Sequence, residues 1–253
     1  MPARRTPSID QELGHNDVVP ASRSAVRAVL GALALGAVVL GARDAAAISM
    51  ERYVRRALDE ATVSLETGCS GALAEHSQLI VTALHCVDDA GQHVMVRLSN
   101  GERRRAWIVD TDAVADQAVL FMEEKVALQP LDVVRRPQIA GTIVYFSGHP
   151  DRPRFQRARL DRVGVCRSLP KLPNALFTTI EGTPGDSGAP IVDGAGRIVG
   201  LVHGGVSCHI ATPATTLAPM IAEILAPSPS TPRAVRWRTD PPAAASPLAC
   251  RAR

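Results

Sequence analysis

Short apolar runs separated by turn residues fill the middle of the chain. The pattern predicts strands over residues 62–65, 78–82, 93–98 and 106–109, and then over 141–146, 157–165, 176–180, 191–192 and 197–203. The dipeptide Asn100-Gly101 lies between two of these runs, and Asn-Gly between alternating runs is a strong hairpin signal. Strands of this length and spacing are typical of closed antiparallel sheets, so we expect an all-β core.

Two helices and a tail flank this core in the prediction. The helices cover residues 50–58 and 215–225, and Pro227 ends the second. Residues 227–253 are rich in Pro, Ala and Arg and hold too little apolar surface to fold. We therefore predict that this tail is disordered.

The first part of the chain has the pattern of a targeting signal. Residues 28–42 consist only of Ala, Val, Leu and Gly, with Arg27 before them and Arg43 after them. A run of this length fits the apolar region of a signal peptide and is shorter than the about 20 residues of a membrane-spanning helix. We predict a signal peptide over 1–47, cleaved near Ala47, and a secreted or periplasmic protein with no stable membrane partner. The alternatives are an uncleaved anchor and a buried Ala-rich helix.

Composition allows a sizeable core and narrows the classes of partner. The 253 residues are 46% hydrophobic and 21% charged, and the formal net charge is only +3. The arginines are scattered along the chain, which argues against a nucleic-acid partner. One or two domains are expected.

Five cysteines follow the predicted cleavage site, at positions 69, 86, 166, 208 and 250. None of them shows the CxxC spacing of a zinc or redox motif, so we expect no metal and no cofactor. In an oxidising compartment, two disulfides and one leftover thiol are the natural interpretation. Spacing alone does not give the pairing.

The strongest chemical motif is GDSGAP at residues 185–190, which leads directly into an apolar strand. Glycines let the backbone turn tightly and aim N–H groups at one point. A serine hydroxyl is a weak nucleophile until a base takes its proton, and the oxyanion that develops needs preorganised donors. We therefore predict Ser187 as the nucleophile and the N–H groups of Gly185 and Ser187 as the oxyanion hole.

Two further segments supply the partners of this serine. His85 in TALHC follows an apolar strand where the chain leaves the core, which suits a general base. Asp116 in DQAVL leads into an apolar run that would bury its carboxylate beside the imidazole. Asp110 and Asp112 are alternatives, but no such run follows either of them.

Together, TALHC, DQAVL and GDSGAP resemble the three signature segments of the chymotrypsin/trypsin-like serine peptidase family, in its compact bacterial form and in its order His, Asp, Ser. The α/β-hydrolase motif GxSxG is excluded because Ala189 stands at its last glycine. The resemblance implies two packed antiparallel β-barrels, over 48–131 and 132–226, with a short C-terminal helix. It also implies a Cys69–Cys86 disulfide, and Cys166 with Cys208 is a second candidate pair.

The resemblance also places a substrate pocket. By counting from Ser187, Glu181 falls at the pocket floor, where a carboxylate would favour basic side chains, although Glu181 could instead face solvent or pair with an arginine. Thr183 and Gly205 are further pocket candidates. His203 either resembles the pocket histidine of glutamate-specific relatives or supports Asp116.

The sequence thus predicts an exported serine endopeptidase that acts as a monomer on protein or peptide substrates. The alternatives are a catalytically idle binding protein and an esterase-like serine hydrolase, both on the same fold. In this family the aspartate at the position of Asp186 receives the new N-terminal amine of a processed zymogen. Cleavage after Ala47 would supply such an amine on Ile48.

Overall fold

The computed structural model describes residues 47–88, 91–204 and 209–226. The chain divides into two units, Met1–Ile48 and Ser49–Arg253, and nearly all of the described residues belong to the second. The predicted signal peptide, apart from residue 47, and the predicted tail with Cys250 lie outside the described residues, as do Gly205 and Cys208. Within the described ranges, no helix is long and apolar enough to cross a membrane.

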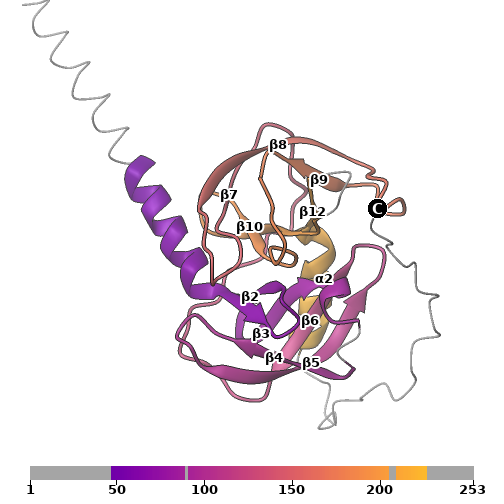
Figure 1. The fold of residues 1–253 in the computed structure, drawn as a ribbon. Helices are drawn as coiled ribbons and strands as arrows, with labels where there is room; N and C mark the ends of the chain where they lie inside the picture. The colour runs from indigo at the N-terminus through magenta and orange to yellow at the C-terminus, as the bar shows by residue number, and fades with distance from the viewer. Residues whose placement is uncertain (1–46, 89–90, 205–208, 227–253) are drawn as a thin grey trace, which may run out of the picture. The chain divides into compact units, whose positions relative to one another are not determined.

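Six antiparallel strands close into a first barrel in the spatial order β1-β2-β3-β6-β5-β4 (Figure 1). Strand β4 alternates buried with half-exposed positions, as expected where one face meets the core, whereas β1 and β2 are buried along their whole length. The strands are β1 (Thr62–Leu65), β2 (Ser70–Ala74), β3 (His76–Ala83), β4 (His93–Arg97), β5 (Arg103–Asp112) and β6 (Gln117–Met122).

A second closed barrel follows, in the order β10-β11-β12-β9-β8-β7. Its long strand β8 alternates over its first half, and β11, which is buried at every position, lies between β10 and β12. The strands are β7 (Ile143–Phe146), β8 (Gln156–Gly164), β9 (Ala175–Thr178), β10 (Pro190–Val192), β11 (Ile198–Val202) and β12 (Ile210–Pro213).

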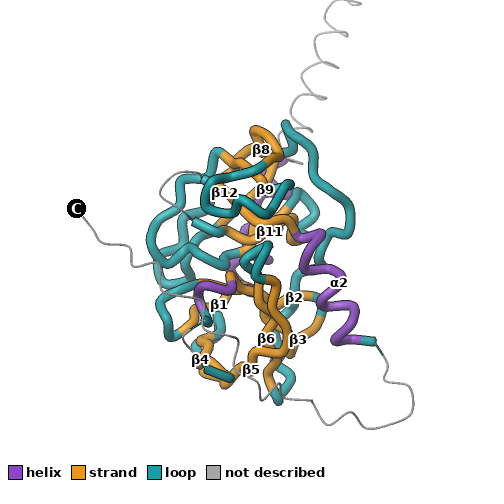
Figure 2. Tube along the Cα trace, turned by 90° about the vertical axis from the view of Figure 1, so that its right-hand side faces the viewer, coloured by secondary structure: helices purple, strands orange, loops and turns teal. Residues whose placement is uncertain are grey.

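Helix α2 (Ala214–Leu225) packs against β6 of the first barrel and β11 of the second (Figure 2). The buried Gln117 side chain adds a polar link at the same junction. Its amide donates to the Thr212 hydroxyl at 2.7 Å and to the Pro213 carbonyl at 3.1 Å, and its oxygen accepts from the Thr216 hydroxyl at 2.6 Å. The two barrels are therefore joined by both apolar packing and hydrogen bonds.

A second helix covers residues 47–61 and packs with Val54 and Leu58 fully buried. It contacts the segment between β7 and β8. The Ser147 hydroxyl donates to Asp59 at 3.0 Å, and the Arg55 guanidinium lies 4.5 Å from the centre of the Phe155 ring. The helix thus packs against the β7–β8 segment of the second barrel.

The architecture confirms the predicted fold class of two antiparallel β-barrels with a short C-terminal helix. The domain boundaries at 48–131 and 132–226 stay predictions. The strand prediction missed β2 and β12, and left β6 as an apolar run without assigning it. Strand β2 reads Ser-Gly-Ala-Leu-Ala and has no β-branched residue, and β12, Ile-Ala-Thr-Pro, is a four-residue strand that ends in proline. The first helix also begins earlier than predicted and ends later.

Candidate active site

Asp116 lies in the turn before β6 and is only 8% exposed. Its φ of +54° is in the left-handed region, which is uncommon for a residue other than glycine but tolerated by aspartate. The carboxylate accepts the His85 backbone N–H at 2.9 Å on Oδ1 and the His85 Nδ1 at 2.7 Å on Oδ2. His85 itself lies in the 3-10 turn Leu84–Cys86 that follows β3. The two residues predicted as base and orienting acid are thus brought together.

The disulfide between Cys69 and Cys86 joins the start of β2 to this turn, in agreement with the pairing that the family resemblance implied. It fixes the chain directly beside His85. Cys166 is buried. The pairing predicted for it involves Cys208, outside the described residues, and stays a prediction.

A second imidazole also binds Asp116. The Nδ1 of His203, at the end of β11, lies 2.5 Å from Asp116 Oδ2, and the rings of His85 and His203 meet edge to face with 5.4 Å between their centres. This contact is the one expected if His203 supports Asp116, the second of the two roles left open for it. One carboxylate oxygen therefore accepts from two imidazoles.

These contacts move two pKa values in opposite directions. Burial alone would raise the Asp116 pKa, but the hydrogen bonds from His203 and His85 outweigh it and hold the pKa below its usual value. The hydrogen bond to Asp116 raises the His85 pKa above its ordinary 6.5, although burial opposes this. Because an anionic carboxylate only accepts, Nδ1 of His85 carries a hydrogen and its Nε2 keeps a lone pair for a proton.

Ser187 lies on the turn before β10 and is half-buried. Its Oγ is 3.4 Å from the His203 carbonyl, and among the described residues it forms no hydrogen bond with His85. Catalytic hydrogen bonds are often long in ligand-free enzymes. Gly204 leaves room for this hydroxyl: its φ is +76°, and a Cβ there would lie 3.2 Å from Ser187 Oγ.

The predicted oxyanion donors are the N–H groups of Gly185 and Ser187. Within the described part of the chain neither N–H has an acceptor. The neighbouring carbonyls are occupied: Pro184 accepts from Arg152 Nη2 at 3.4 Å, and Gly185 accepts from the Ser70 hydroxyl at 2.7 Å. The oxyanion hole stays a prediction.

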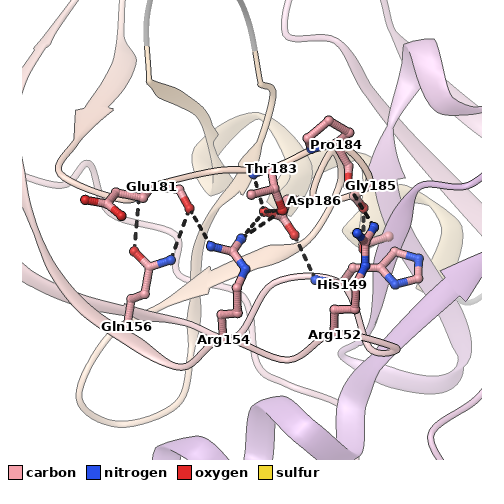
Figure 3. A network of polar contacts seen from close by, with 10 residues as sticks. His149, Arg152, Arg154, Gln156, Glu181, Thr183, Pro184, Gly185 and Asp186 are labelled. Carbon is pink, nitrogen blue, oxygen red and sulfur yellow. Dashed lines mark hydrogen bonds and ion pairs between the residues drawn. The ribbon is translucent and has the colours of Figure 1, made fainter.

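Asp186 is buried at the centre of a polar network (Figure 3). Its Oδ1 accepts the His149 N–H at 2.8 Å. Its Oδ2 accepts the Thr183 N–H at 2.6 Å, the Thr183 hydroxyl at 3.1 Å and the Arg154 guanidinium at 2.6 Å. The place that an N-terminal amine takes in processed zymogens of the resembled family is thus filled by Arg154, while Ile48 is 56% exposed.

The other predicted pocket residues lie beside this network. The Glu181 carbonyl accepts from the Gln156 amide and from the Arg154 guanidinium at 3.1 Å, and the Glu181 N–H donates to the Gln156 side-chain oxygen. The exposed Glu181 carboxylate makes no ion pair with any described residue. Figure 3 shows that carboxylate pointing away from Asp186. Thr183 binds Asp186, and Gly205 lies outside the described residues.

Sequence reasoning missed Arg154, His149 and Ser70. All three bind residues of the turn that carries the nucleophile. Arg154 and His149 bind Asp186, which lies 32 and 37 residues further along the chain, and Ser70 binds Gly185, which lies 115 residues further along. No local motif marks such contacts. Only Arg154 carried a weak signal, because it lies in an arginine-rich segment.

Comparison with known proteins adds a family and a fold. A family model described as a trypsin-like peptidase domain matches residues 69–201, a range that includes all three predicted catalytic residues. The crystal structure of Deg5 matches with a TM-score of 0.58 at 22% identity, covering 70% of this chain and 95% of that one. The crystal structure of the inactive form of Rv3671c protease matches with a TM-score of 0.55 at 23% identity, covering 68% and 93%. No curated protein matches the chain.

Proposed function

This chain belongs to the trypsin-like peptidase family, and on that premise we propose that it is a serine endopeptidase that hydrolyses peptide bonds through an acyl-enzyme on Ser187. The observation that carries the proposal is the His85–Asp116 pair. The His85 imidazole is oriented by a buried anionic carboxylate that raises its pKa, and the next residue, Cys86, has its Sγ 3.7 Å from the Ser187 carbonyl.

The proposed reaction has two halves. Nε2 of His85 takes the Ser187 hydroxyl proton while Oγ attacks the substrate carbonyl, and the oxyanion accepts from the N–H groups of Gly185 and Ser187. His85 then gives its proton to the leaving amine as the C–N bond breaks. Water, deprotonated by His85, hydrolyses the acyl-enzyme and restores Ser187. Asp116 stays anionic throughout and stabilises the imidazolium.

We propose that His203 positions Asp116 and does not read the substrate. Its Nδ1 is 2.5 Å from the carboxylate, so the ring is directed at the triad. Arg154 supports activity without N-terminal insertion, because it already supplies a cation to Asp186. Processing at Ala47 would then serve export and not activation.

Glu181 remains the candidate for substrate preference. Its carboxylate is exposed and Arg154 pairs with Asp186 instead, which leaves negative charge to receive a basic side chain. Cleavage of a peptide library should favour Arg and Lys before the scissile bond, and Glu181→Gln should remove that preference. Glu223→Gln, an equivalent change on the exposed side of α2, is the control. Equal profiles for both variants would exclude Glu181 from the pocket.

Export to the periplasm or cell exterior, a monomeric state and protein or peptide substrates complete the proposal. The test is hydrolysis of casein, of peptide amides and of ester substrates by the purified chain. Ser187→Ala should abolish all three activities, while Ser99→Ala, which removes an exposed hydroxyl, should leave them unchanged. Ester cleavage alone would indicate the esterase alternative, and no cleavage would indicate an idle binding protein.

A further inference from the structure

Ser70, the first residue of β2, reaches across from the first barrel to the turn that carries Ser187. Its backbone N–H donates to the Ser187 carbonyl at 2.9 Å, and its hydroxyl donates to the Gly185 carbonyl at 2.7 Å. Its side chain is fully buried. One residue thus binds the carbonyls of both residues whose N–H groups form the proposed oxyanion hole.

The bond from Ser70 holds one end of the peptide group between Gly185 and Asp186. Gly185 has a φ of +98°, and glycine populates both signs of φ about equally, so its own backbone preference does not select this conformation. The peptide between Gly185 and Asp186 is instead fixed at both ends. Its oxygen accepts from Ser70, and its N–H donates to the Thr183 carbonyl at 3.0 Å.

Ser70 is itself held firmly. The Thr82 hydroxyl on β3 donates to the Ser70 carbonyl at 2.7 Å, and the adjacent Cys69 is tied to Cys86. The nucleophile turn approaches so closely that a Cβ on Gly188 would lie 2.2 Å from the Ser70 carbonyl oxygen. The first barrel therefore fixes the position of Ser70, and Ser70 in turn holds the nucleophile turn of the second barrel.

We propose that Ser70 is a positioning residue for the oxyanion hole: its hydroxyl fixes the peptide group that follows the Gly185 Cα, and this holds the turn that carries the Gly185 and Ser187 N–H groups in place before substrate arrives. This inference rests on the proposed peptidase function. Oxyanion donors contribute mainly when charge develops in the transition state, and removing one costs about 10²- to 10³-fold in kcat. Loosening one donor should cost less, about tenfold or more, with little change in KM.

The test compares Ser70→Ala with Thr62→Val, which removes another buried hydroxyl of the first barrel that bonds a backbone carbonyl. Ser70→Ala should lower kcat. It should lower the affinity for a peptide aldehyde, whose hemiacetal oxygen occupies the oxyanion hole, by the same factor. Thr62→Val should change neither. Ser70→Cys, which keeps a weak donor of similar size, should be intermediate.

Folding and function are separated by two further measurements. Thermal unfolding shows whether each variant is folded, and hydrogen–deuterium exchange over residues 183–189 should rise in Ser70→Ala alone. A folded Ser70→Ala with unchanged kcat and aldehyde affinity overturns the inference and leaves the peptidase assignment standing. An equal loss of kcat and of aldehyde affinity in Ser70→Ala and in Thr62→Val also overturns it. A wild-type chain that never cleaves overturns the assignment and this inference together.

Discussion

The Arg154–Asp186 pair makes a quantitative prediction about how the nucleophile turn is held. The Asp186 side chain is 2% exposed and that of Arg154 is 36% exposed. Arg154→Gln removes the charge but leaves three neutral donors on the carboxylate, from Thr183 and His149. Breaking a fully buried ion pair costs about 3–5 kcal/mol. With those donors retained and Arg154 partly solvated, we expect about 2 kcal/mol of lost stability.

The assay is urea unfolding in a Ser187→Ala background, which prevents self-digestion. Arg159→Gln is the matched control, since Arg159 pairs with Asp161 at 3.1 Å on an exposed surface and should contribute less than about 1 kcal/mol. With Ser187 restored, Arg154→Gln should also lower kcat because Asp186 adjoins the nucleophile. Equal unfolding free energies for the two arginine variants would refute the reasoning. So would full activity in Arg154→Gln.

Three further predictions concern the groups around the triad. Because Asp116 raises the His85 pKa, kcat/KM should fall in acid with a midpoint above 6.5, the ordinary imidazole value; a midpoint at or below 6.5 would contradict this. His203→Ala removes a charge-assisted hydrogen bond to Asp116 and should lower kcat by about tenfold with KM nearly unchanged, whereas an effect on KM alone would return His203 to the substrate pocket. Replacing Cys69 and Cys86 by alanine opens a loop with a sequence separation of 17 and should cost about 2–4 kcal/mol of unfolding free energy. Thermal unfolding with and without reductant checks this, and no difference between the two conditions would contradict it.

Asp116 also links stability to acid. Its folded pKa lies below the unfolded value of 3.8, so its contribution to stability is present above that value and is lost as pH falls through the folded pKa. His85 acts in the opposite sense. Its folded pKa is raised, so its contribution is complete below 6.5 and is lost as pH rises through the folded pKa.

The sequence was most informative where chemistry and structure are local. Each predicted catalytic residue stands in a short segment that carries its own signal, and Asp116 was preferred to Asp110 because of the apolar run that forms β6. Strands with β-branched residues and clear turns were also predicted. Strand β2 was not predicted because Ser, Gly and Ala have weak strand propensity, and this segment is a strand only because it pairs within the barrel.

The parts that could not be predicted depend on contacts between distant segments. Ser70 and Gly185 are 115 residues apart, and His203 and Asp116 are 87 apart. Counting from Ser187 placed His203 near the pocket, but the direction of its ring depends on how β11 lies against the first barrel. Hydrophobic pattern and spacing contain no information on that direction.

The central claim is that Ser187 is a nucleophile activated by His85. Mass spectrometry of the intact chain after reaction with a fluorophosphonate tests this most directly, with the adduct located by peptide mapping. We expect one adduct on Ser187, none in Ser187→Ala, and labelling slowed by about 10³-fold or more in His85→Ala. An unlabelled wild-type chain, or an adduct on another residue, would contradict it.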